Sequence, residues 1–151
     1  PDASWTSVEA AMRSTDPYRF AEVPWVPRKL DQWLDLAHDA VHRSGGVASR
    51  LYDILEDELN AVTWWEAHVP VVIVFACAEL AAYEPLATMQ LVLEFGRDTD
   101  SDLQLAGAFF GALHGTAVFP AEMRGVVEAR LEIDYGATVG DWMRLLGHER
   151  R

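Results

Sequence analysis

Helical spacing of apolar residues runs along nearly the whole chain, whereas the alternating pattern of half-buried strands is almost absent. The clearest face lies in residues 28–43 and consists of Leu30, Trp33, Leu34, Ala37 and Val41. The Ser-Gly-Gly sequence at residues 44–46 supplies a stop, and residues 47–59 then repeat the pattern with a row of acids opposite the apolar side. The two segments predict a helical hairpin.

The segment 66–82 is apolar on most sides and rich in β-branched residues, so a buried strand competes with a buried helix. Its length favours the helix. Further helices are expected at 7–13, 84–95, 103–114, 120–133 and 139–146, the first of them ended by Asp16-Pro17. With no repeat, low-complexity tract or linker, we expect an all-α orthogonal helical bundle that forms a single unit over residues 1–151.

Charge and composition exclude several classes of function. The chain has 151 residues, a length that fits one domain or a piece of a larger one, and half of them are apolar, so it should fold. The 24 acidic residues outnumber the 12 basic ones and are spread along the chain, which argues against binding to nucleic acid or to an anionic membrane. An acidic surface can still hold divalent cations, and a bound cation would admit a phosphate-bearing ligand.

The apolar stretch 69–83 is interrupted by Glu79 and is shorter than the ~20 residues of a membrane span, so no membrane partner is expected. Cys77 is the only cysteine and lies inside this stretch, which predicts a buried, reduced thiol and no internal disulfide. A reducing, cytoplasmic setting follows as an expectation.

The most informative stretch is Asp-Thr-Asp-Ser-Asp at residues 98–102, called the acidic turn below. Mg²⁺ prefers oxygen ligands, and closely spaced carboxylates with a hydroxyl supply several from one turn. A calcium-binding EF-hand is excluded, because Leu103 and Phe109 stand where that loop needs Gly and Glu. The alternative is that Asp100 or Ser101 only caps the following helix, and from the turn alone the cap is the stronger interpretation.

The helix after the turn changes that balance. Gly107, Gly111 and Gly115 recur at every fourth residue, and each glycine inside a helix costs ~1 kcal/mol relative to alanine. We therefore expect a neighbouring helix to approach this face closely and to fix where the acidic turn points.

The run from Gly96 to Gly115, GRDTDSDLQLAGAFFGALHG, resembles the C-terminal signature of the ADP-ribosylglycohydrolases. In that family a G-x-D-[TS]-D-[TS] turn precedes an A-G-A-x-x-G-A helix. Weaker similarity is found at Asp16-Pro17-Tyr18, at residues 66–70, at Phe119-Pro120 and in the helix that carries Glu128, Arg130 and Leu131. The resemblance implies an ADP-ribosylglycohydrolase-like fold, of which this chain would be the C-terminal part.

The resemblance also implies a site. Asp98, Asp100 and Ser101 match the family residues that bind a pair of Mg²⁺ ions, with Asp100 as the bridging carboxylate. Arg97 would reach a phosphate of the ligand, although a plain surface arginine is the alternative. Family enzymes further need a Thr-Asp-Asp triplet and a catalytic acidic residue from an N-terminal half, and no Thr-Asp-Asp occurs here. The catalytic residues and the second half of the metal site are thus expected on an N-terminal segment or companion chain.

Three functions follow from these patterns. The first is an Mg²⁺-dependent hydrolase that removes ADP-ribose from a protein or small-molecule acceptor, this chain supplying half of the metal site. The second is a non-catalytic relative that binds ADP-ribose or serves a structural role. The third is an acidic helical bundle whose turn is only a cap.

Three other patterns are weaker. His38 and His42 imitate a zinc-binding pair, but Asp39 replaces the usual Glu and no third ligand follows, so two partly exposed histidines are expected. Stacking of Trp64, Trp65 and His68 on an adenine is less favoured than core packing. A nucleophilic role for Cys77 has no supporting spacing.

Overall fold

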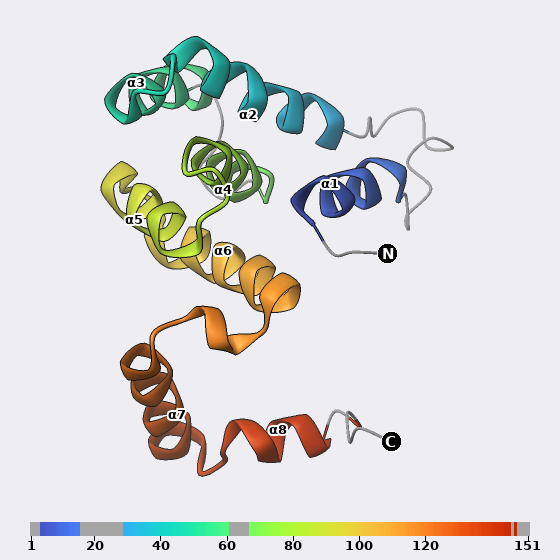
Figure 1. Ribbon diagram of the computed structural model, residues 1–151, viewed down its shortest axis with the longest axis vertical. Coiled ribbons are helices and arrows are strands. Elements are labelled where there is room, and N and C mark those ends of the chain that lie inside the picture. Colours follow the sequence, from blue (N-terminus) through green and yellow to red (C-terminus); the bar gives the residue numbers. More distant parts are fainter. Residues whose placement is uncertain (1–3, 16–28, 61–66, 146, 148–151) are drawn as a thin grey trace. The chain divides into compact units, whose positions relative to one another are not determined.

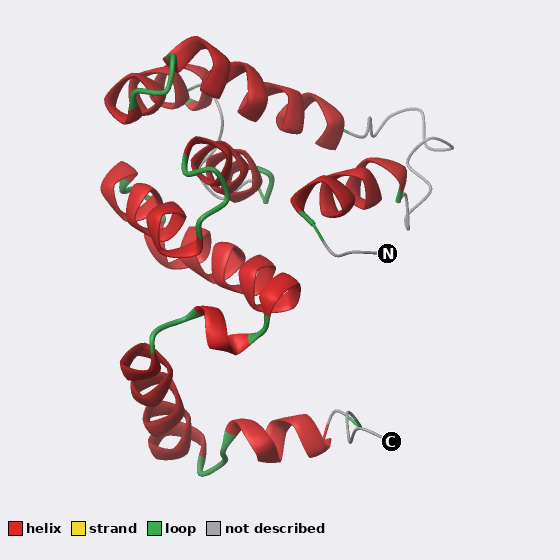
Figure 2. Cartoon of the chain, in the orientation of Figure 1, coloured by secondary structure: helices red, strands yellow, loops and turns green. Residues whose placement is uncertain are grey.

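The computed structural model describes residues 4–15, 29–60, 67–145 and 147 (Figure 1). Within these ranges the chain is helical and contains no strand (Figure 2), which confirms the all-α prediction. The helices are α1 (Trp5–Ser14), α2 (Leu30–Ser44), α3 (Ala48–Leu59), α4 (Val69–Leu80), α5 (Pro85–Phe95), α6 (Thr99–His114), η2 (Thr116–Val118), α7 (Ala121–Tyr135) and α8 (Val139–Leu145). They form two compact units, Pro1–Leu113 and His114–Arg151.

Helix α4 is the centre of the first unit. It lies between the hairpin α2–α3 and helix α5 (Figure 1), and every residue from Val72 to Ala78 is buried. Pro70 occupies the first turn, where its missing N–H costs nothing. The segment forms a helix and not the competing strand. Its β-branched residues are tolerated in a helix because burial on all sides outweighs their intrinsic preference for strands.

The hairpin of α2 and α3 forms where the spacing predicts it. Leu34 and Ala37 from α2 and Leu51 and Leu55 from α3 are all inaccessible to solvent. The turn between them begins at Gly45. This residue has a φ of 60°, a left-handed conformation that favours glycine, and it terminates α2. The stop read from the sequence is confirmed.

Helix α1 is fastened to the unit by an aromatic cluster. Ser4 and Ser7 cap the helix reciprocally through their hydroxyls, so α1 begins earlier than residue 7. The Trp5 ring then lies 5.2 Å from Phe75 of α4 and 5.4 and 5.1 Å from Phe109 and Phe110 of α6, measured between ring centroids. One side chain therefore joins three helices.

Helix α6 begins four residues earlier than the sequence pattern indicates. Its first residue is Thr99 and not Leu103, and the backbone N–H of Asp102 already donates to the Asp98 carbonyl at 3.1 Å. Carboxylates in a first turn are stabilised by the positive end of the helix dipole, which allows the acids to extend the helix. Asp100 and Ser101 consequently lie inside the first turn, one and two residues beyond its start.

The expected close approach at the glycines is wrong at the two positions where the structure shows their surroundings. At Gly107, no heavy atom of the described residues lies within 4 Å of the place a Cβ would occupy. Gly115 lies beyond the end of α6 and has a φ of 75°, so its role is to turn the chain. Among the described residues nothing packs against Gly107, so the expected packing compensation is not found there.

We therefore expect Gly107→Ala to raise the free energy of unfolding of the chain by about 1 kcal/mol, because alanine removes the entropic cost of glycine without meeting a neighbour. Urea denaturation followed by circular dichroism measures this. A loss of stability in Gly107→Ala would show that another surface covers the face in solution.

The second unit consists of η2, α7 and α8. Helix α8 starts with a reciprocal cap between Thr138 and Asp141, and the rings of Tyr135 and Trp142 join α7 to α8 with centroids 6.2 Å apart. No apolar residue of this unit is buried within the described part of the chain. Its helices follow the predicted segments, but their apolar side chains face solvent.

Three sequence patterns, Asp16-Pro17-Tyr18, Trp64 and Trp65, lie outside the described residues. Among the helices that are described, none combines the length and the hydropathy that crossing a bilayer requires.

Candidate functional site

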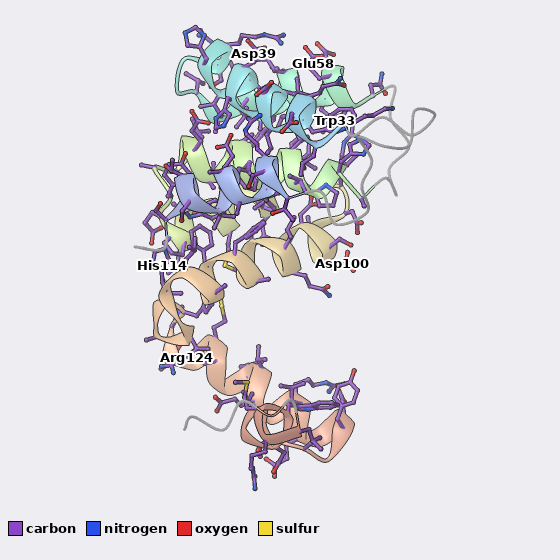
Figure 3. All side chains as sticks on the ribbon, turned by 90° about the vertical axis from the view of Figure 1, so that its right-hand side faces the viewer. Trp33, Asp39, Glu58, Asp100, His114 and Arg124 are labelled. Atoms are coloured by element: carbon purple, nitrogen blue, oxygen red, sulfur yellow. The ribbon has the colours of Figure 1, made fainter. Side chains whose placement is uncertain are left out.

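The acidic turn is positioned by two successive residues in the left-handed region. Helix α5 ends at Phe95, and Gly96 follows with a φ of 85° and a ψ of −144°, a conformation that essentially only glycine adopts. Arg97 follows with a φ of 65°. The chain thereby reverses within two residues and presents Asp98 directly before the first turn of α6, at the end of the helix where Asp100 is labelled in Figure 3.

Arg97 ties this reversal to helix α3. Its guanidinium forms a two-point pair with the carboxylate of Glu56, from Nε to Oε1 at 2.6 Å and from Nη2 to Oε2. It also lies 5.8 Å from the centre of the Phe95 ring, and its side chain is only 12% exposed. Arg97 thus supports the turn through Glu56, and a contact with a ligand phosphate stays a prediction.

The side chains of the turn divide into an exposed and a buried set. Asp98 and Asp100 are exposed and Ser101 is half-buried. Asp102 is fully buried, and neither of its carboxylate oxygens has a hydrogen-bond partner among the described residues. Burial, together with the negative charges of Asp98 and Asp100, raises the pKa of Asp102 to about 7.

Cys77 of α4 is buried in the core of the same unit. Burial, with the negative charge of Asp102, raises the pKa of the Cys77 thiol to about 12. The thiol is therefore protonated at neutral pH and is a poor nucleophile, in agreement with the sequence interpretation.

The match to known proteins decides the family. The sequence profile described as ADP-ribosylglycohydrolase matches residues 2–149. The chain belongs to the ADP-ribosylglycohydrolase family. Neither the curated proteins nor the solved structures contain a significant match. The family is one of hydrolases, and its all-α fold agrees with the helices seen here.

For a member of the ADP-ribosylglycohydrolase family, the turn fits part of a magnesium site. Its donors are carboxylate and hydroxyl oxygens, the ligands that Mg²⁺ prefers, and a cation would compensate the unpartnered charge of Asp102. Within the described part of the chain, however, no group of three His, Cys, Asp or Glu residues is arranged to hold a metal ion. The acids of the turn therefore do not form a metal-binding cluster on their own within the described residues.

Sequence reasoning missed Glu56 and Asp102. Glu56 belongs to a row of acids on α3, and no spacing rule relates that row to a residue 41 positions later. The sequence shows Asp102 only as one of three acids in the turn. Apolar periodicity does not place the start of α6, so it does not show which of the three side chains points into the core.

A second charged cluster of this family member joins α1, α2 and α4. His38 lies with Nδ1 2.5 Å from Glu79 and with Nε2 3.0 Å from Glu9, so both ring nitrogens are engaged and the zinc pattern with His42 is not formed. The charged and titratable groups around it are Arg13, Asp31, Asp35 and Tyr83. Burial opposes protonation of His38, but the hydrogen bonds with Glu9 and Glu79 outweigh it and raise its pKa above 6.5.

The cluster predicts a pH dependence of stability. Because the folded-state pKa of His38 is raised, its contribution is complete below 6.5 and is lost as the pH rises through that pKa. Burial opposes ionisation of Glu9, but His38 and Arg13 lower its pKa below 4.5, so its contribution is complete above 4.5 and is lost as the pH falls through the lowered pKa. The network is strongest between these limits.

We expect His38→Gln to remove the part of this dependence that lies above pH 6.5, measured as the unfolding free energy from pH 5 to 9. The exposed His42→Gln is the matched control and should keep the wild-type profile. Identical profiles for His38→Gln and the wild type would contradict the assignment.

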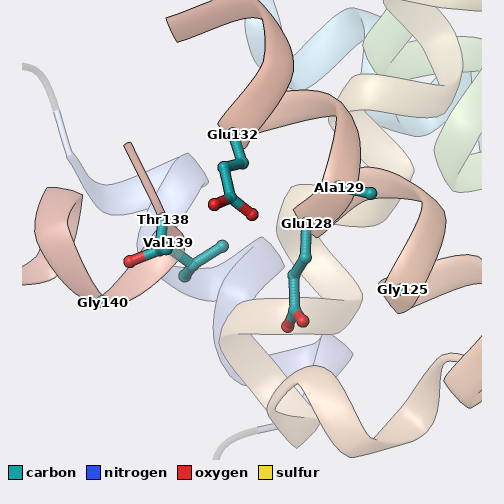
Figure 4. Close-up of a pocket in the computed structure, with 7 residues that line it drawn as sticks. All are labelled: Gly125, Glu128, Ala129, Glu132, Thr138, Val139 and Gly140. Carbon is teal, nitrogen blue, oxygen red and sulfur yellow. The ribbon is translucent and has the colours of Figure 1, made fainter. Parts of the chain in front are cut away.

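The second unit contains a pocket of about 430 Å³ (Figure 4). Glu128 and Glu132 lie one turn apart on α7 and line it together with Thr138, Val139 and Gly140 at the start of α8. These residues come from outside the family motif, and two exposed carboxylates alone do not specify a ligand.

Proposed function

We propose that this family member takes part in the Mg²⁺-dependent hydrolysis of ADP-ribosyl glycosidic bonds and that Asp98, Asp100 and Ser101 supply half of its metal site. The observation that carries the proposal is the family motif in its structural context. The first turn of α6 presents two exposed carboxylates beside a half-buried hydroxyl and a buried, unpartnered carboxylate. Such a concentration of negative oxygens is compensated best by a divalent cation.

The chemistry divides between the ions and the chain. Bound Mg²⁺ would polarise the ADP-ribosyl group and orient the attacking water. Asp98 and Asp100 would hold the cations and neutralise part of their charge. The pair of Arg97 and Glu56 would keep the turn in position while substrate binds.

The remaining ligands are proposed to come from a segment that carries a Thr-Asp-Asp triplet, because the present sequence contains none. That segment would also contribute the acidic catalytic residue. Its place, on the same polypeptide or on a companion chain, is an outcome of the experiment below. The single, buried cysteine agrees with a reducing, cytoplasmic setting.

The experiment measures release of ADP-ribose from a mono-ADP-ribosylated protein, with the chain alone and with a companion that carries the triplet. We expect release in Mg²⁺ from the complete protein and its loss on chelation with EDTA, restored by excess Mg²⁺. Release that is unaffected by EDTA would overturn the metal-dependent proposal.

The missing triplet favours one alternative, a non-catalytic relative that binds ADP-ribose or has a structural role. In that case the complete protein releases no ADP-ribose. Calorimetry then distinguishes the two versions of this alternative, since a binding protein takes up ADP-ribose and a structural protein does not. Measured release would exclude this alternative.

A further inference from the structure

Asp102 differs from every other acid of the acidic turn. Its side chain is inaccessible to solvent, whereas Asp98 and Asp100 are exposed. Both of its oxygens lack a hydrogen-bond partner among the described residues. A buried carboxylate in this state is costly, because it has lost its hydration and gained no protein partner.

The direction of the side chain places the carboxylate at the turn. Asp102 follows Asp98 by four residues, and the hydrogen bond from its N–H to the Asp98 carbonyl shows that both lie on the same face. Cα–Cβ bonds in a helix tilt toward the N-terminus, so the Asp102 carboxylate leans back over the turn that contains Asp98.

The basic residue next to the turn is already engaged. Arg97 donates two hydrogen bonds to the carboxylate of Glu56 on α3. No described side chain is bonded to the Asp102 carboxylate, so its charge is neutralised either by a proton or by a bound cation.

We propose that Asp102 is an additional oxygen ligand of the cation that binds at the first turn of α6, contributed from the core side of the helix. This inference rests on the proposed function. It enlarges the set of ligands beyond Asp98, Asp100 and Ser101, which are the positions that match the family motif. Asp98 and Asp102 would both help to hold the cation, and its other ligands would come from water, from the ligand phosphates or from another segment.

The chemistry selects Mg²⁺ or a similar hard cation. Mg²⁺ is commonly held by one or two carboxylates and keeps several waters or phosphate oxygens as ligands. Ca²⁺ takes six to eight oxygen ligands, most of them usually from the protein. Asp98 and Asp100 are exposed, so waters and phosphate oxygens can complete the coordination of a cation held by carboxylates of the turn.

Isothermal titration of the full chain with MgCl₂ and, separately, MnCl₂ tests the inference. The variants are Asp102→Asn, which keeps shape and removes charge, Asp100→Asn, and the exposed Asp53→Asn on α3 as a control for net charge. We expect cation affinity to fall about tenfold or more in Asp102→Asn, as is typical when a supporting group of a metal site is removed. Asp53→Asn should titrate as the wild type.

Thermal unfolding with and without Mg²⁺ supplies a second readout. Asp102→Asn should unfold at a higher temperature than the wild type without metal, because a buried, unpaired carboxylate is gone, yet gain less from added Mg²⁺. If Asp102→Asn does not fold, Asp102→Glu and Asp102→Leu are compared instead. Asp102→Glu retains a carboxylate and should still bind the cation measurably, whereas Asp102→Leu should lose cation binding.

The outcomes are distinct. Wild-type affinity in Asp102→Asn together with reduced affinity in Asp100→Asn overturns this inference and leaves the proposed function standing. Absence of cation binding by the wild-type chain with its companion segment present, or wild-type affinity in Asp100→Asn, overturns both.

Discussion

Replacement of Trp5 by alanine is expected to lower the free energy of unfolding by about 3–5 kcal/mol, the cost of removing a large buried aromatic side chain. The indole is 6% exposed and contacts the rings of Phe75, Phe109 and Phe110. It is thus the point at which α1, α4 and α6 meet, and the cavity left by alanine cannot be filled without moving one of these helices. Urea denaturation of the full chain measures the change.

The matched control is Trp142→Ala in α8. That indole is 42% exposed and its ring contact is with Tyr135. Its loss should change the free energy of unfolding by only about 0.5 kcal/mol, as is usual for surface positions. A similarly small effect for Trp5→Ala would mean that α1 does not pack against α4 and α6 in solution.

Asp100→Asn is expected to reduce Mg²⁺-dependent release of ADP-ribose by the complete protein by about 100-fold or more, since even supporting groups of metal sites cost 10- to 100-fold. The substitution preserves the shape of the side chain and removes the charge that would bridge two cations. Asp100 is exposed and lies in the first turn, so the variant should fold as the wild type does.

Asp53→Asn removes the same charge from an exposed position on α3 and should leave the rate unchanged. Full activity of Asp100→Asn would exclude the turn as a metal site and return it to the role of a helix N-terminus stabilised by acids.

The helices themselves were predictable because each carries a local pattern. The hairpin of α2 and α3 follows from apolar spacing and from the glycine stop at Gly45, both of which act within a few residues. Helix α4 was predicted correctly from length alone, although its composition suits a strand equally well. Such elements are specified by neighbours in sequence, so sequence suffices to find them.

The sequence indicates a candidate site but does not determine its geometry. The motif gave the position of Asp98, Asp100 and Ser101, whereas the inward direction of Asp102 depends on α6 beginning at Thr99. Apolar periodicity cannot reveal that start, since the first turn is held by acids. The pair of Arg97 and Glu56 depends on tertiary packing between distant segments, which no local pattern records.

The glycines of α6 show how a pattern can be interpreted too strongly. Regular spacing suggested a close helix contact, but at Gly107 the space is open and Gly115 lies beyond the end of the helix. A small-residue face indicates only that close approach is sterically possible. Whether a partner occupies it is decided by the rest of the fold.

Calorimetric titration of the chain with Mg²⁺, in the presence and absence of ADP-ribose, addresses the cation site itself. Binding of Mg²⁺ that strengthens with ADP-ribose and is lost in Asp100→Asn is the behaviour expected of half of a metal site at the first turn of α6. Absence of any Mg²⁺ binding by the wild-type chain, with its companion segment present, would contradict it and leave the acids with a structural role alone.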